Sequence, residues 1–280
     1  MSHAYAATHP LPTGGEVAVL SDPGPRPHNL HHVSIASHHT GTAVSICEGD
    51  TLDNDASRAG AHARIAAEVS AAAAAHTANP AAGVYAARTA LETSLADDHL
   101  PFPPDTVSIV TSVATAVITD WTIDLCWMGE SVRAFALTTE QMVHTLVQAH
   151  PQGSHPYHAV PPVRRRHVWR EPPGEVEHDD LVLDLRRFLL CSDSLTLPLG
   201  TADLTRIMRR DTSAAITCAE LIHAAKQRGA LGNLTVALID LPPSTRPNAA
   251  QAVRIKRLDL HTTAAPAHAA HQTAPRLHVA

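Results

Sequence analysis

The order of strand-like and helix-like segments constrains the fold of this chain more than any other feature. Three short runs rich in apolar and β-branched residues come first, and two Ala-rich stretches follow them. A second series of strand-like runs comes next, and then a helix and a last apolar run at residues 234–241. Runs of strands interrupted by pairs of helices favour antiparallel sheets with helices outside them. We therefore expect an α+β chain whose helices cover the outer faces of its sheets.

The expected strands share short length, β-branched residues and flanking polar turns. They lie at residues 16–21, 32–36, 42–47, 106–111, 114–119, 123–128, 132–137, 188–192 and 234–241.

The expected helices rest on Ala content and on apolar spacing. Residues 55–76 are rich in Ala, the best helix former, and Pro80 can open a second helix at its first position. Residues 139–149 are interpreted as a third helix. Thr217 and Glu220 have the spacing of a capping box, which predicts a helix that ends near Gly229.

Composition bounds the class of protein. The chain has 280 residues, enough for a sizeable core, and only 3% of them are aromatic, so that core must consist mainly of Ala, Val, Leu and Ile. A formal net charge of -6 gives no electrostatic reason to expect nucleic-acid or anionic-membrane binding. The four cysteines lie in apolar runs without a CxxC pair, which favours reduced thiols in a cytoplasmic protein.

The domain organisation follows from where the patterned segments begin and end. Residues 1–14 are expected to be a flexible N-terminus without a signal peptide, and residues 15–242 to form one domain. Residues 243–280, rich in Ala, Pro and His, are expected to be a mostly disordered tail. Residues 151–173 form a Pro-rich loop with the basic run Arg164, Arg165 and Arg166, and it is the candidate partner-facing element outside the domain's cleft.

Five segments in order carry a family resemblance. WMGESVRAFAL at 127–137 resembles a strand-turn-strand with Gly-Asp-Ser-Arg at its turn, and FLLCSDSL at 188–195 is similar to Leu-Leu-Cys-Ser-Asp-Gly-Leu. Residues 219–241 resemble a closing helix, an Asp-Asn pair and a last strand. Weaker matches lie at 21–31, against a segment ending in Arg-x-x-Asn-Glu-Asp, and at 45–49, against a strand ending in Asp-Gly. Across about residues 16–241 the chain thus resembles the metal-dependent serine/threonine protein phosphatases, called PPM or type 2C.

The resemblance implies a fold and a site. The fold is a four-layer αββα sandwich, with two antiparallel sheets face to face and helices outside each. The site lies at one end of the sheets, where carboxylates and water hold two divalent cations, usually Mn or Mg. A water that bridges the metals attacks the phosphorus of a phosphoserine or phosphothreonine.

The residues at the matching positions depart from that site. The resemblance assigns phosphate binding to Arg26 and metal binding to Glu48, Gly49 and Asp193, with His31, Asp50 and Asn233 as weaker candidates. Leu30 and His31 stand where the family has two acids. Other replacements are Glu130 for the turn aspartate, Ser194 for the glycine after Asp193, and Gly232 for the Asp of the Asp-Asn pair.

Two carboxylates are too few to offset the repulsion between two hard cations. We therefore expect a catalytically impaired homologue, a pseudophosphatase, that binds Mn or Mg weakly or not at all. It would act in phosphoprotein signalling by binding a phosphoprotein or a serine/threonine kinase. The alternative is an active Mn- or Mg-dependent serine/threonine phosphatase with a remodelled site, to which Asp50, Asp53 and Asp55 are the nearest extra carboxylates, although a polar loop before a helix explains them as well.

A third, more distant alternative is a histidine metal site. Histidine ligands suit a softer metal such as Zn, and several lie close together in the sequence at His28, His31, His32, His38 and His39. A strand alternates its faces, so only some of these rings can converge. Composition bias explains the 21 histidines of the chain equally simply.

Overall fold

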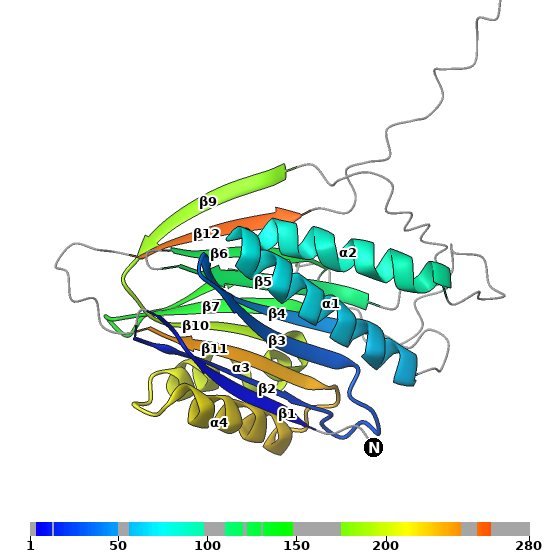
Figure 1. Cartoon of the computed structure of the whole chain (residues 1–280). Coiled ribbons are helices and arrows are strands. Elements are labelled where there is room, and N and C mark those ends of the chain that lie inside the picture. The colour runs from blue at the N-terminus through cyan, green and yellow to red at the C-terminus, as the bar shows by residue number, and fades with distance from the viewer. Residues whose placement is uncertain are drawn as a thin grey trace, which may run out of the picture.

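The computed structural model describes residues 4–12, 14–49, 56–97, 110–119, 122–129, 131–147, 175–241 and 251–258. Within these residues the chain forms two six-stranded sheets that lie face to face, with one pair of helices outside each sheet (Figure 1). The four-layer αββα sandwich that the resemblance implied is therefore confirmed.

The first sheet is antiparallel throughout and has the strand order β1-β2-β11-β10-β7-β8. Its strands are β1 (Tyr5–Pro10), β2 (Glu16–Asp22), β7 (Val132–Thr138), β8 (Val143–Val147), β10 (Leu185–Ser192) and β11 (Leu234–Asp240).

The second sheet has the order β3-β4-β5-β6-β12-β9. Its strands are β3 (His31–His38), β4 (Gly41–Gly49), β5 (Val110–Ile118), β6 (Thr122–Met128), β9 (Glu175–Leu183) and β12 (Gln251–Leu258). One pair departs from the expected antiparallel pattern, because β12 runs parallel to β6.

The helices pack where their small residues allow a close approach. Helices α1 (Ala56–Thr77) and α2 (Pro80–Asp97) cover the second sheet through buried alanines such as Ala63, Ala67 and Ala87. Helices α3 (Asp193–Met208) and α4 (Ala214–Gln227) cover the first sheet (Figure 1). Among the helices of the described residues, none is long and apolar enough to cross a membrane.

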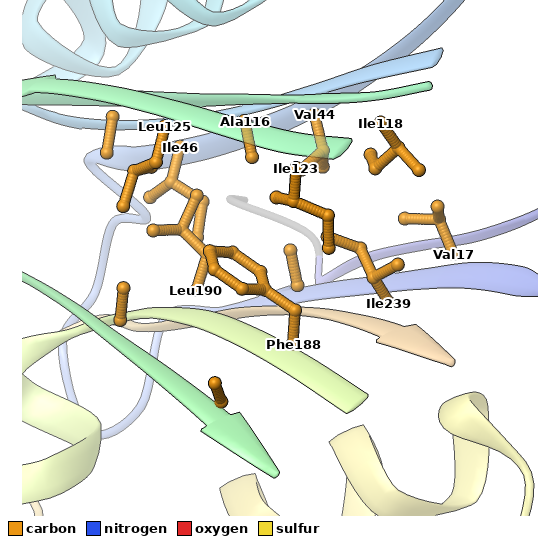
Figure 2. Close-up of a cluster of buried hydrophobic side chains, with 14 of the residues drawn as sticks. Val17, Val44, Ile46, Ala116, Ile118, Ile123, Leu125, Phe188, Leu190 and Ile239 are labelled. Carbon is orange, nitrogen blue, oxygen red and sulfur yellow. The ribbon is translucent and has the colours of Figure 1, made fainter. Parts of the chain in front are cut away.

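The main core lies between the two sheets and follows from strand alternation. In β4 the side chains of Val44 and Ile46 face the other sheet, whereas Cys47 packs under α1 and α2. Figure 2 shows Val44 and Ile46 across from Phe188 and Leu190 of β10. With few aromatic residues, this interior consists mainly of Val, Ile, Leu and Ala, as the composition predicts.

Several boundaries differ from the sequence-based expectations. The supposedly flexible first 14 residues contain β1, which gains backbone hydrogen bonds by pairing with β2. The supposedly disordered tail contains β12, which lies between β6 and β9. Strand β9 was not expected at all. Strand β1 was missed because it is largely exposed and pairs only at the edge of its sheet, whereas β9 and β12 are stabilised by partners distant in sequence.

Three local predictions were also wrong. Residues 139–149 were expected to form a helix, but Thr138 and Met142 close a hairpin turn in which Gln141 takes a φ of 65°, and β8 follows. Residues 110–118 form one continuous strand, β5, without the break that was expected between 111 and 114, and residues 106–109 lie outside the described residues. Helix α4 begins at Ala214 rather than Thr217, because Ser213 is its N-cap and accepts a hydrogen bond from Ile216 N at 3.4 Å.

Candidate functional site

A group of buried polar side chains gathers at one end of the sandwich. Each lies where a strand passes from apolar to polar sequence, and each is at most 4% exposed: Ser21, Glu48, Ser112, Ser192, Asn233 and Thr235. Hydrogen bonds join the two sheets at this end, since Ser21 Oγ donates to His31 O and Ser131 N donates to Ser112 Oγ. The ends of β4 and β10 therefore bring Glu48 and Asp193 to the same region, close enough for the charge of Asp193 to act on Glu48.

Glu48 lies near the end of β4 and its side chain faces the space between the sheets. Burial raises its pKa well above the usual range, and the nearby charge of Asp193 raises it further. A hydrogen bond from Ser131 and the charge of Arg133 act in the opposite direction without cancelling these effects. Burial therefore works against the ionised form of the Glu48 carboxyl.

Asp193 is the first residue of α3 and faces an arginine. Its backbone N–H donates to Ser131 O at 2.7 Å, which fixes the turn from β10 into the helix. Arg133 Nη2 lies 3.8 Å from Asp193 Oδ2, and Arg133 Nη1 donates to Val132 O at 2.8 Å. Burial raises the pKa of Asp193 while Arg133 lowers it. A fixed cation thus already faces this carboxylate.

Sequence reasoning missed the role of Arg133. The arginine of the family's Gly-Asp-Ser-Arg turn aligns with Val132, so the cation stands one residue later and on the opposite face of β7. Arg133 is only 8% exposed in a strand that is otherwise apolar apart from its last residue, Thr138. An arginine inside such a strand was the available signal, because a buried arginine requires an acidic or carbonyl partner.

Asn233 organises the loop between β2 and β3. Its Oδ1 accepts a hydrogen bond from Leu30 N at 3.0 Å. Its Nδ2 donates to Pro23 O at 2.9 Å and to His28 O at 2.8 Å. This candidate metal ligand therefore uses its amide oxygen to hold the backbone of the loop.

The remaining candidates are spread around the same end. Gly49 N donates to Leu30 O at 2.9 Å, so Gly49 lies beside the loop that Asn233 holds. Arg26 is exposed in that loop, and its Nε donates to Leu231 O at 2.9 Å. His31 is the cross-strand partner of Glu48, and burial lowers its pKa to about 4.

Some predicted residues lie outside the described residues. They are Asp50, Asp53, Asp55, Glu130, the loop 151–173 and its basic run Arg164, Arg165 and Arg166.

The donor set of the described residues does not fit a two-cation centre. Burial raises the pKa of Glu48, and Arg133 Nη2 already lies 3.8 Å from the carboxylate of Asp193. Hard cations need several ionised oxygen ligands. Among the residues that the structure describes, no three or more His, Cys, Asp or Glu side chains are arranged to hold a metal ion. The same holds for His28, His31, His32, His38 and His39, the residues of the histidine metal site considered above.

Comparison with known proteins gives a fold. No protein-family model matches the sequence, and no curated protein matches it. Among solved structures, the serine/threonine phosphatase PstP/Ppp of Mycobacterium tuberculosis is 21% identical, with a TM-score of 0.51 over 85% of this chain and 98% of that one.

Two further solved structures similar to this chain are also serine/threonine phosphatases. A catalytic domain of the serine/threonine phosphatase PstP in complex with two manganese ions is 18% identical, with a TM-score of 0.54 over 85% of this chain and 98% of its own. The serine/threonine phosphatase of S. agalactiae is 20% identical, with a TM-score of 0.52 over 81% of this chain and all of its own. Together with the two facing sheets and their outer helices, these likenesses show that the chain has the fold of the PPM-type serine/threonine phosphatases.

Proposed function

We propose that this protein is a PPM-type phosphatase homologue with impaired catalysis, which acts in phosphoprotein signalling by binding. The observation that carries the proposal is the pairing of Arg133 with Asp193, at 3.8 Å, beside a Glu48 whose pKa burial raises. Together these residues reach charge balance without a divalent cation.

The electrostatic argument concerns the charge that faces a metal. Two doubly charged ions about 3.5–4 Å apart repel each other strongly, and several carboxylates must offset that repulsion. At this site an ion would have to deprotonate a buried glutamic acid and compete with a guanidinium for the aspartate. We therefore expect millimolar affinity for Mn or Mg, or none.

The binding role rests on Arg26 and on the loop that carries it. Arg26 is exposed, and guanidinium groups recognise phosphate with bidentate geometry. Asn233 fixes this loop through three hydrogen bonds, so the arginine starts from an ordered backbone. The proposed partner is a phosphoserine- or phosphothreonine-containing protein, or a serine/threonine kinase, in the cytoplasm. The cytoplasmic location is supported by four cysteines that are all free and buried.

Enzymatic assay tests the proposal. The purified full chain is incubated with p-nitrophenyl phosphate and with a phosphothreonine peptide, each with Mn and with Mg. We expect no turnover above that of the Asp193→Ala variant. Turnover that Asp193→Ala abolishes would instead establish the second candidate, an active Mn- or Mg-dependent phosphatase, which the shared position of Glu48 and Asp193 favours.

A binding measurement tests the signalling role separately. Fluorescence anisotropy with a phosphothreonine peptide and its unphosphorylated twin should show preference for the phosphorylated form. Arg26→Met should weaken binding about tenfold, while Arg206→Met, on the exposed surface of α3, should leave it unchanged. Equal affinity for the two peptides contradicts phosphate recognition.

A further inference from the structure

A second polar site lies at the opposite end of the first sheet. A cavity of about 560 Å³ opens between the turn after β7, the start of β10, the end of β11 and the turn from α3 to α4. Strand β10 separates this cavity from Asp193, and its eight residues correspond to a length of roughly 25 Å. The cavity is lined by Thr139, Gln141, Arg186, Arg187, Asp211, Thr212, Ser213, Asp240 and Leu241.

Arg187 gives this cavity a rigid base. Its side chain is 1% exposed and pairs with Asp240 Oδ2 at 3.0 Å. The same guanidinium donates to Met208 O at 2.9 Å and to Arg210 O at 2.7 Å, and it also bonds Thr212 O. Because Arg187 is fully engaged with these acceptors, it holds the α3–α4 turn against the sheet, and its charge is balanced by Asp240.

Arg186 differs from Arg187 in that its ion-pair partner, Asp211, is easily displaced. Arg186 Nη2 lies 2.8 Å from Asp211 Oδ1, but the side chain of Asp211 is 98% exposed while that of Arg186 is 27% exposed. An ion pair with so exposed a partner contributes little to stability, since solvent screens the attraction and holding the side chain in place costs conformational entropy. Arg186 is thus held in the cavity wall with a counter-ion that can swing out into water.

The other lining groups favour a small polar ligand. Thr212 and Ser213 offer hydroxyls and Gln141 offers an amide, whereas Thr139 Oγ1 already donates to Asp184 Oδ2 at 2.6 Å. Among the described lining residues, Leu241 alone has an aliphatic side chain without a polar group. The volume is in the range of small-molecule sites. Hydroxyl, amide and guanidinium donors around one accessible cation fit an oxyanion.

We propose that this cavity binds a small oxyanion of the phosphate or phosphoryl class on Arg186, in place of Asp211. The site is independent of the end of the sandwich that contains Glu48 and Asp193. The arginine provides the charge-assisted hydrogen bonds, and the neighbouring hydroxyls complete the ligand's shell.

Two variants with opposite expected effects test the proposal. Inorganic phosphate and glycerol phosphate are titrated into the full chain by calorimetry at low ionic strength. Arg186→Met keeps the aliphatic stem and should weaken binding at least about tenfold. Asp211→Asn removes the internal competitor and should tighten binding about two- to fivefold, the worth of an exposed ion pair.

Controls separate this site from the proposed phosphopeptide site. Arg26→Met should leave phosphate binding at the cavity unchanged, and Arg186→Met should leave phosphopeptide binding unchanged. Urea denaturation shows whether the Arg186→Met variant is folded. The Arg186→Lys variant keeps the positive charge but lacks the bidentate guanidinium, so it should bind phosphate with an intermediate affinity. Tighter binding of glycerol phosphate than of phosphate identifies an organic phosphoryl group as the ligand class, and the reverse identifies the free ion. No binding of either by the full chain at 10 mM, or weaker binding by Asp211→Asn, overturns the proposal.

Discussion

Ser194 occupies the space into which a side chain at position 232 would grow. An ideal Cβ on Gly232 would lie 3.0 Å from Ser194 Cβ and closer still to its Oγ. The phosphatase family that this chain resembles has glycine at the position of Ser194 and aspartate at the position of Gly232. An aspartate at 232 would therefore overlap the side chain of Ser194, whereas glycine at 194 would leave room for it.

The first prediction follows from this contact. Gly232→Asp alone should destabilise the protein by about 1–3 kcal/mol, because the new side chain overlaps Ser194. Ser194→Gly combined with Gly232→Asp should recover most of that loss and add a third carboxylate beside Glu48 and Asp193. Urea denaturation measures the stability, and calorimetry with Mn should show tighter binding in the double variant. Additive effects of the two substitutions would contradict the steric link.

The second prediction concerns Arg133. Arg133→Met removes the cation that faces Asp193 and leaves a partly buried carboxylate without it, which should destabilise the protein by about 1–3 kcal/mol. Mn should then stabilise the variant in thermal unfolding, because binding to the folded state alone raises its stability. Arg186→Met, at the other end of the sheet, is the control and should gain no response to Mn. A Mn response equal to that of the unmodified chain would count against Arg133 as the balancing charge.

The third prediction concerns the loop between β2 and β3. Asn233→Ala removes three hydrogen bonds between the side chain of Asn233 and the backbone of this loop. Each is worth about 1 kcal/mol, so the free energy of unfolding should fall by about 2–3 kcal/mol. The exposed Gln227→Ala should cost less than about 0.5 kcal/mol. Chemical denaturation compares the two variants. Phosphopeptide binding should fall with Asn233→Ala as well, because Arg26 loses its ordered loop.

The fourth prediction concerns pH. Burial lowers the pKa of His31 from 6.5 to about 4, so between these values the unfolded chain binds a proton that the folded chain rejects. The contribution of His31 is fully present above about pH 6.5 and is lost as the pH falls towards 4. The loss amounts to at most about 3 kcal/mol.

The matched variants are His31→Gln and His223→Gln, the latter on the exposed face of α4. Urea denaturation at pH 7.5 and pH 4.5 should show a smaller difference in stability between the two pH values for His31→Gln than for the unmodified chain. His223→Gln should leave the difference unchanged. An unchanged difference in His31→Gln would falsify the assignment.

Much of the fold was predictable because it depends on local patterns. The apolar runs of β2, β4, β7, β10 and β11 and the Ala-rich α1 and α2 were all found in the sequence. Strands β1, β8, β9 and β12 were not found, since edge pairing and partners distant in sequence decide them.

By itself the sequence predicted, through the family resemblance, which carboxylates of the site are replaced and that Glu48 and Asp193 remain, because side-chain identity at a matching position needs no coordinates. Only the tertiary structure decided that Arg133 faces Asp193 and that Ser194 fills the space beside Gly232. These relationships join residues on different strands and turns. Distance and burial, which set both charge balance and steric exclusion, exist only once the strands are paired.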